Sequence, residues 1–194
     1  MPEVVATSRL VAVVPNLLSI LRIVLAVIFP LTPAGHGIRV VVVVAGGASD
    51  WIDGQIARRY AVTTTLGGLL DAFADKLFVF MVIATLTWDG QFQLWQAAMV
   101  LARDFAVAFV AAYAAVQQDW PTFRQMRPRP LGKVTTFAQF ALILIALIWP
   151  ALLPIAITGT IGVSVLTTGD YLIQFTRALK ERPQRRVEAP SKSR

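Results

Sequence analysis

The sequence predicts an all-α integral membrane protein, a bundle of six transmembrane helices with both termini cytoplasmic. The first observation is composition: of 194 residues, 56% are hydrophobic and 15% are charged, whereas an average soluble domain has about 45–50% apolar and about 25% charged residues. The second is that the apolar residues form six long blocks, each close to the roughly 20 residues that span a bilayer. The third is that Lys and Arg gather in alternate connections between these blocks, as cytoplasmic loops require.

The six blocks are separated by stretches rich in turn-forming and helix-ending residues, such as PLTPAGHG, TWDGQ and WPALLP. We expect residues 1–10 to form an interfacial segment, residues 11–178 the six-helix domain, and residues 179–194 a basic, disordered cytoplasmic tail. The helices are expected at residues 11–31, 37–59, 66–87, 94–117, 131–149 and 153–177.

The orientation follows from the distribution of positive charge between the two sides. Only Arg39 falls on one side, and the other basic residues of the loops and tail fall on the opposite side, which is therefore expected to be cytoplasmic. Tryptophans at the outer ends of three helices would form an interfacial aromatic belt, namely Trp88, Trp95 and Trp149.

Charge and cysteine content narrow the partners. The net charge is +7, and the basic residues adjoin apolar blocks, so lipid headgroups or a phosphorylated substrate are expected in place of nucleic acid. The chain has no cysteine, which excludes disulfides and thiolate metal sites.

Four aspartates stand out because ionisable groups inside a membrane are costly and usually functional. On the second block, one helical face carries Asp50, Asp53, Gly54, Ala57 and Arg58. On the third block, residues spaced by four are Gly67, Asp71 and Asp75. A short loop joins the two blocks, so we expect antiparallel neighbouring helices whose four carboxylates converge near the cytoplasmic surface.

Four carboxylates in one dry site need compensating charge. Oxygen ligands without His or Cys favour Mg²⁺, Mn²⁺ or Ca²⁺ over zinc, and four aspartates suit two divalent ions, as in phosphoryl transfer. Arg58 has the donor geometry to hold a phosphate. The plainer alternative is that the aspartates only pair with Arg58, Arg59 and Lys76 at the membrane edge.

The motif Asp50-x2-Asp53-Gly54-x2-Ala57-Arg58-x8-Gly67-x3-Asp71-x3-Asp75 resembles the signature of the CDP-alcohol phosphatidyltransferases, and the six-helix layout is similar to theirs. The resemblance implies that Asp50, Asp53 and Asp71 bind two Mg²⁺ or Mn²⁺ ions. It implies that Asp75 is the general base and also contacts a metal. It also implies a homodimer, and residues that bind the CDP-linked lipid at Gly54, Ala57, Arg58 and Gly67.

Outside the signature, PNLLSILR and RPRPLGKVTTFAQ resemble the phosphatidylglycerophosphate synthase group. Asn16 would then line the CDP-lipid pocket, or alternatively act as a polar contact between helices. Three basic residues are candidates for binding an anionic acceptor: Arg22, Arg103 and Lys133. Lys133 could equally be an interface lysine, and a second lysine, common in that group, is replaced here by Thr135.

The interpretation that follows is phosphatidyl transfer from CDP-diacylglycerol to sn-glycerol 3-phosphate, which releases CMP and forms phosphatidylglycerophosphate. Phosphatidylglycerol, giving cardiolipin, is the second acceptor, and inositol phosphate is the third. The enzyme would lie in a prokaryotic cytoplasmic membrane with its active site facing the cytoplasm. A cation-coupled transporter is the alternative of another class, although its carboxylates would be expected nearer the midplane.

Overall fold

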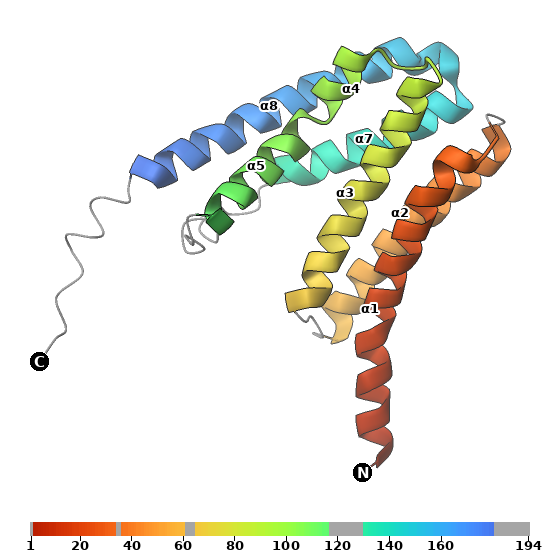
Figure 1. Ribbon diagram of the computed structural model, residues 1–194, viewed down its shortest axis with the longest axis vertical. Coiled ribbons are helices and arrows are strands. Elements are labelled where there is room, and N and C mark those ends of the chain that lie inside the picture. Colours follow the sequence, from red (N-terminus) through yellow and green to blue (C-terminus); the bar gives the residue numbers. More distant parts are fainter. Residues whose placement is uncertain (1, 34–35, 61–64, 117–129, 181–194) are drawn as a thin grey trace, which may run out of the picture.

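A computed structural model describes residues 2–33, 36–60, 65–116 and 130–180, and every regular element among them is helical (Figure 1). Some side chains within these helices, including those of Asp53, Ala57 and Arg58, lie outside the described part. The elements in chain order are α1 (Pro2–Ile28), η1 (Phe29–Leu31), α2 (His36–Tyr60), α3 (Thr65–Trp88), α4 (Leu94–Val100), α5 (Ala102–Val116), α7 (Pro130–Ile148), η2 (Pro150–Leu152) and α8 (Leu153–Lys180).

All six apolar blocks are helical, and the all-α prediction is confirmed. The predicted count of six transmembrane spans is not confirmed. By length and composition, only residues 150–177 qualify as a span among the described helices. A second is added if α4 and α5 form one bent span. The apolar helices at 16–31 and 132–148 are shorter. At the N-terminus, α1 runs without a break from Pro2, so residues 2–10 belong to it.

The fourth block was wrongly expected to be one helix. It breaks at Leu101, and the axes of α4 and α5 differ in direction by 58°. The carbonyl oxygen of Val100 accepts hydrogen bonds from the side chains of Gln139 on α7 and Ser164 on α8, each at 3.0 Å. These long-range donors satisfy a carbonyl at the bend, which a membrane interior otherwise penalises.

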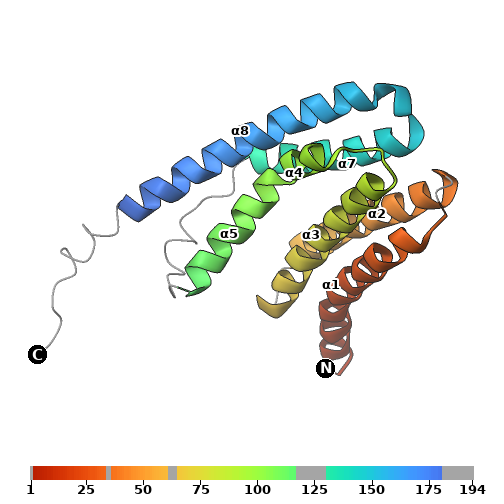
Figure 2. The same ribbon diagram turned by 45° about the horizontal axis from the view of Figure 1, so that its top comes forward.

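The helices form two groups that meet at one end of the molecule and diverge toward the other (Figures 1 and 2). In the first group, α1 packs against both α2 and α3. In the second, α8 packs against α4, α5 and α7. Contacts between α2 and α7 join the groups.

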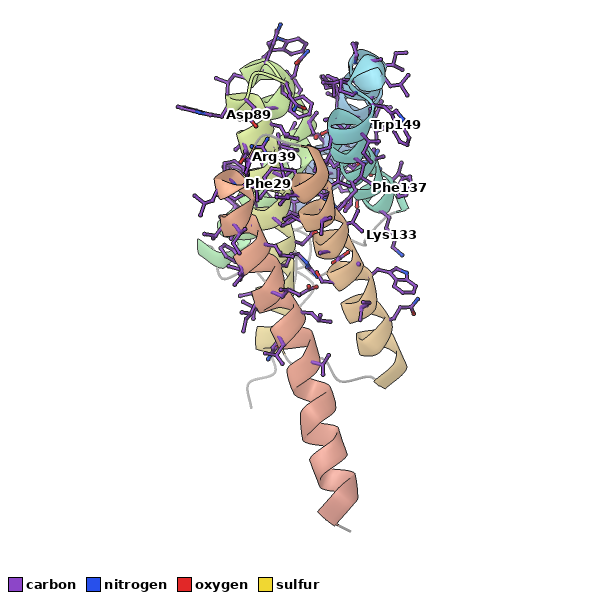
Figure 3. All side chains as sticks on the ribbon, turned by 90° about the vertical axis from the view of Figure 1, so that its right-hand side faces the viewer. Phe29, Arg39, Asp89, Lys133, Phe137 and Trp149 are labelled. Carbon is purple, nitrogen blue, oxygen red and sulfur yellow. The ribbon has the colours of Figure 1, made fainter. Side chains whose placement is uncertain are left out.

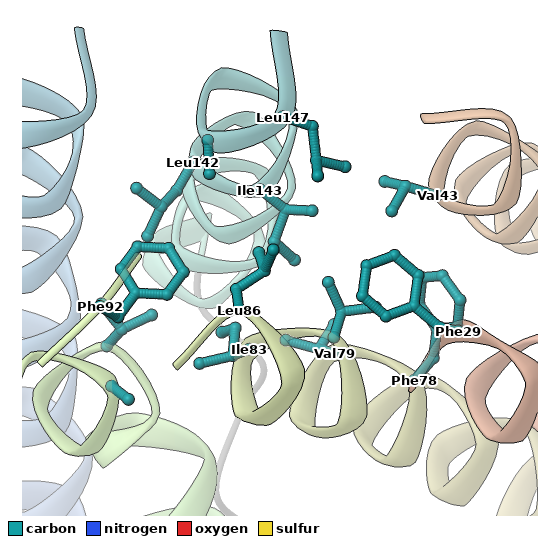
Figure 4. Close-up of a cluster of buried hydrophobic side chains, with 14 of the residues drawn as sticks. Phe29, Val43, Phe78, Val79, Ile83, Leu86, Phe92, Leu142, Ile143 and Leu147 are labelled. Atoms are coloured by element: carbon teal, nitrogen blue, oxygen red, sulfur yellow. The ribbon is translucent and has the colours of Figure 1, made fainter. Parts of the chain in front are cut away.

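A hydrophobic core fills the end where the groups meet (Figure 4). It draws side chains from both groups, so burial of apolar surface holds the two together at this end. The largest fully buried apolar members are Phe29, Phe78, Ile83, Leu86, Leu142, Ile143 and Leu147.

An ion pair closes the same end of the first group. The buried guanidinium of Arg39, near the start of α2, pairs with Asp89, which directly follows α3 (Figure 3). Arg39 also lies over the ring of Phe29, with Cζ 5.4 Å from the ring centroid. Three helix ends are therefore tied together by one side chain.

Glycine allows α2 and α3 to approach closely. A Cβ added at Gly46 would lie 2.5 Å from Cζ of Phe78 on α3, a distance at which the buried ring must move. The adjacent Gly47 faces Phe140 of α7, whose Cε1 atom would lie 2.9 Å from an added Cβ. These two glycines let α2 pack closely against α3 in its own group and against α7 in the other group.

We predict that Gly46→Ala destabilises the protein by about 1–3 kcal/mol, the usual cost of overpacking a close-packed core. Thermal unfolding of the detergent-solubilised protein measures the change. Gly162→Ala on α8 is the matched control, since no heavy atom lies within 4 Å of its added Cβ, and alanine there should be neutral or slightly stabilising. Equal unfolding temperatures for the two variants would contradict the packing described.

Candidate active site

Two of the four aspartates meet at one arginine. Nη1 of Arg22, on α1, lies 2.9 Å from Oδ1 of Asp71 on α3 and 3.3 Å from Oδ1 of Asp50 on α2. The two carboxylates therefore converge, as the sequence predicted, although α1 supplies a cation between them. Their side chains are 43% exposed at Asp50 and 42% at Asp71, so a ligand from solution can reach them.

Arg22 itself is completely buried, with a side-chain exposure of 0%. Its Nε and Nη2 atoms are buried and find no hydrogen-bond partner in the described structure. Ser19, one helical turn earlier, is also buried, so this face of α1 is turned into the group. A buried arginine needs an anion, and here it finds two.

Asp75 lies one turn beyond Asp71 on α3, on the same face. Its Oδ2 atom is 3.3 Å from Nζ of Lys76, whereas its Oδ1 atom is buried and has no hydrogen-bond partner within the described part of the chain. Asp75 is close enough to Asp50 for the two carboxylates to repel each other. One oxygen of Asp75 therefore contacts Lys76, and the other meets no described hydrogen-bond partner.

These residues fit a divalent cation. The carboxylate oxygens of Asp50, Asp71 and Asp75 are hard donors of the kind that Mg²⁺ and Mn²⁺ prefer. Among the described side chains, no three or more such ligands form a closed cluster. Arg22 lies between Asp50 and Asp71, and the side chain of the expected ligand Asp53 is outside the description.

The predicted metal ligand Asp53 and the predicted lipid-binding residues lie on α1, α2 and α3. Asp53, Gly54, Ala57 and Arg58 lie on α2 beyond Asp50, and their side-chain environments fall outside the described residues. Gly67 lies in the first turn of α3, before Asp71. Asn16 is half-buried on α1, six residues before Arg22. The roles of these residues remain predictions.

The three candidate acceptor residues do not form one group. Arg22 lies among the acids, while Nη1 of Arg103 on α5 is 3.0 Å from Oδ1 of Asp104. Nη2 of Arg103 also lies 2.9 Å from the position of a Cβ added at Gly132, so glycine leaves room for the guanidinium beside α7. Lys133 is exposed and lies along one side of α7 with Phe137 and Trp149 (Figure 3).

Sequence reasoning missed two partners of Asp104, which are Lys76 and Gln139. Its Oδ1 atom is 2.8 Å from Nζ of Lys76, and its Oδ2 atom accepts a hydrogen bond of 2.7 Å from Nε2 of the fully buried Gln139. Lys76 directly follows Asp75 in the sequence, which is a signal for a nearby charge partner. No local pattern, however, indicates that this partner lies on α5.

The comparison with known proteins decides the family. A sequence model described as CDP-alcohol phosphatidyltransferase matches residues 12–168, most of the chain. The chain belongs to the CDP-alcohol phosphatidyltransferase family. The matched region includes both groups of helices and all four aspartates, and it favours the enzyme interpretation over the transporter interpretation.

Relatives within the family have different names. The chain is 32% identical over 141 residues to a cardiolipin synthase (CMP-forming) of Streptomyces coelicolor, covering 69% of this chain and 63% of that protein. It is 33% identical over 140 residues to a CDP-diacylglycerol–glycerol-3-phosphate 3-phosphatidyltransferase of Rickettsia bellii, covering 69% of this chain and 74% of that protein. A protein of the latter name from Bacillus subtilis is 29% identical over 107 residues, covering 55% of this chain and 53% of its own length.

We predict that Arg22→Gln destabilises the metal-free protein by about 1–3 kcal/mol, because Asp50 and Asp71 lose their shared cation. This is less than the roughly 3–5 kcal/mol for breaking a fully buried pair, since water screens both carboxylates. Mn²⁺ should raise the unfolding temperature of this variant more than that of the unmodified protein, because the ion replaces the missing positive charge.

Thermal unfolding with and without Mn²⁺ measures both effects. Arg177→Gln, at an exposed position near the end of α8, is the control and should behave as the unmodified protein. A metal-free Arg22→Gln protein as stable as that control would show that the arginine does not stabilise the two acids.

Proposed function

We propose that this protein transfers the phosphatidyl group of CDP-diacylglycerol to a hydroxyl of sn-glycerol 3-phosphate, releasing CMP and forming phosphatidylglycerophosphate. The observation that carries the proposal is the convergence of Asp50 on α2 and Asp71 on α3 at Arg22. Asp75 lies one turn beyond Asp71, and its Oδ1 atom has no hydrogen-bond partner among the described residues. These acids belong to the signature of the family that the sequence comparison assigns.

In this proposal the aspartates bind metal ions and a second set of residues binds the CDP-lipid. Asp50, Asp53, Asp71 and Asp75 would hold two Mg²⁺ or Mn²⁺ ions, which supply positive charge to the diphosphate of the CDP-lipid and to the departing CMP. The residues that would bind the CDP-lipid itself are Asn16, Gly54, Ala57, Arg58 and Gly67. The half-exposed carboxylates of Asp50 and Asp71 leave the site open to the diphosphate.

Asp75 is the proposed general base. The acceptor hydroxyl oxygen forms a bond to the phosphorus on the lipid side of the diphosphate, and its proton passes to Oδ1 of Asp75. The bond from that phosphorus to the oxygen shared with CMP breaks, and CMP leaves with the electron pair. Lys76 holds Oδ2 of Asp75, so the carboxylate presents one defined oxygen.

For the acceptor, Arg103 is the best supported of the basic candidates. It is partly exposed, with 18% side-chain exposure, and lies against the first turn of α7 at Gly132. Lys133 follows Gly132 directly, so this region can present two positive charges to a phosphate monoester. Arg22 is less suited to the acceptor because it is engaged with Asp50 and Asp71.

Phosphatidylglycerol, giving cardiolipin, is the second candidate acceptor. The similarity to a protein named cardiolipin synthase (CMP-forming) favours it. Thr135 also favours it, because this residue stands where a second phosphate-binding lysine would be expected for glycerol 3-phosphate. Thr135 is fully buried, and its hydroxyl is hydrogen-bonded to that of Thr167 on α8 at 2.9 Å. Both acceptors offer a glycerol hydroxyl near a phosphate, so the chemistry at Asp75 is the same.

We place the enzyme in the cytoplasmic membrane of a prokaryote, with its acids facing the cytoplasm and with a homodimer as the expected assembly. Large apolar side chains exposed on the outer faces of the helices support contact with lipid, among them Val41, Ile155 and Leu166. The exposed Trp88, Trp95 and Trp149 all lie at the closed end of the bundle, as expected of an interfacial belt at the opposite membrane surface.

The first test is an acceptor panel with purified protein, CDP-diacylglycerol and Mn²⁺ or Mg²⁺. Glycerol 3-phosphate should give CMP together with phosphatidylglycerophosphate, identified by mass spectrometry, and EDTA should abolish both products. Cardiolipin formed from phosphatidylglycerol would instead establish the second acceptor. Absence of acceptor-dependent CMP release with glycerol 3-phosphate, phosphatidylglycerol and inositol phosphate would refute the proposed function.

The second test concerns the base. Asp75→Asn should lower kcat at least about 100-fold, within the range for general-base catalysis, while the protein stays folded. Asp89→Asn is the control, because Asp89 pairs with Arg39 about 21 Å farther along α3 at 1.5 Å rise per residue. Turnover of Asp75→Asn near that of the control would remove Asp75 from the base role.

A further inference from the structure

A lysine connects the proposed base to an aspartate on another helix. Nζ of Lys76 lies 3.3 Å from Oδ2 of Asp75 and 2.8 Å from Oδ1 of Asp104. Asp75 and Lys76 are on α3, in the first group of helices, while Asp104 is on α5, in the second. The ion pair therefore crosses from one group to the other beside the proposed site of reaction.

Both carboxylate oxygens of Asp104 accept hydrogen bonds from other side chains. Oδ1 also accepts a hydrogen bond of 3.0 Å from Nη1 of Arg103, and Oδ2 accepts one of 2.7 Å from Nε2 of Gln139. The same Nε2 atom donates to the carbonyl oxygen of Val100 at the break between α4 and α5. The carboxylate of Asp104 is thus anchored to the bend and to the buried face of α7, and only 11% of its side chain is exposed.

Among the described residues, the ion-pair partners of Lys76 are the carboxylates of Asp75 and Asp104. The side chain of Lys76 is 37% exposed and is flexible, so its position depends on the carboxylates it meets. Asp104 offers it the shorter contact and a rigid position. With Nζ held there, Lys76 reaches Oδ2 of Asp75, while Oδ1 of that carboxylate has no hydrogen-bond partner among the described residues.

We propose that Asp104 is a positioning residue for the transfer reaction, acting through Lys76 to fix which oxygen of Asp75 faces the acceptor hydroxyl. The proposal rests on the proposed function, in which Asp75 takes the proton. The bend at Leu101 then serves the reaction, because it is where α5 begins and where Gln139 and Val100 meet.

The simpler role for Asp104 is to hold α5 against α7 through Gln139. The two roles differ in how Asp104 and Lys76 combine. If Asp104 acts through Lys76, removing either partner loses the same effect, and removing both loses nothing more. If Asp104 only supports the packing of α5, its loss and that of Lys76 act independently.

The experiment is a double-mutant cycle with Lys76→Met, Asp104→Asn and both together. Each single variant should lower kcat about 10–100-fold, as expected for a misplaced catalytic group, with KM for CDP-diacylglycerol changed less than about threefold, since binding groups are intact. The double variant should stay within about threefold of the slower single variant. Effects on kcat that multiply would overturn the proposal.

Two measurements separate positioning from folding. The unfolding temperature of Asp104→Asn should be closer to that of the unmodified protein than the unfolding temperature of Gln139→Leu is. The Gln139→Leu change removes the hydrogen bond between α7 and Asp104 and leaves Lys76 unchanged. Calorimetry with Mn²⁺ and CMP should show affinity within about threefold of the unmodified protein for Asp104→Asn, because that change leaves all four proposed metal ligands in place. Destabilisation of Asp104→Asn as large as that of Gln139→Leu would assign Asp104 a packing role.

Asp104→Glu keeps the charge and provides a second route if Asp104→Asn does not fold. Asp104→Glu should retain a larger fraction of kcat than Asp104→Asn. Combining Asp104→Glu with Lys76→Met should lower kcat no further than Lys76→Met alone. Asp89→Asn, which removes an ion pair at the opposite end of α3, is the matched control and should combine multiplicatively with Lys76→Met. Failure of the unmodified protein in the acceptor panel refutes the proposed function, whereas an active protein with multiplicative effects refutes only the positioning role.

Discussion

The contact of Arg22 with Asp50 and Asp71 is the interaction on which the arrangement of the first three helices depends. A guanidinium with no exposure to solvent requires an anion nearby, and the two carboxylates that repel each other require a cation. One residue of α1 meets both requirements, so α2 and α3 can bring their acids together. The charges expected to bind metal ions therefore also help to organise the bundle.

A second polar centre organises the other group of helices. Gln139 and Ser164 donate to the carbonyl of Val100, and Gln139 also holds Asp104. Inside an apolar bundle these bonds compensate for a carbonyl at the bend between α4 and α5. Lys76 connects this centre to Asp75. The two centres are thus joined next to the residue proposed to accept the proton.

The opposite end of the molecule is built differently. There the core around Phe29 and Phe78 draws on both groups, and Arg39 with Asp89 ties the helix ends. Burial of large apolar side chains holds this end closed, while the helices diverge toward the end that carries the acids (Figure 1). A closed end and an open end suit the proposed transfer between a lipid and an alcohol at these carboxylates.

The sequence by itself determined the helices, the acidic faces and the family, because these follow from local composition and from spacings of three and four residues. It did not reveal that Arg22 lies between Asp50 and Asp71, that the fourth helix breaks at Leu101, or that Lys76 meets Asp104. Each of these depends on which helices become neighbours, and a helical pattern indicates which face is polar without naming the partner of that face. Only the tertiary structure decided those pairings, since donors and acceptors far apart in the chain must satisfy one another wherever water is excluded.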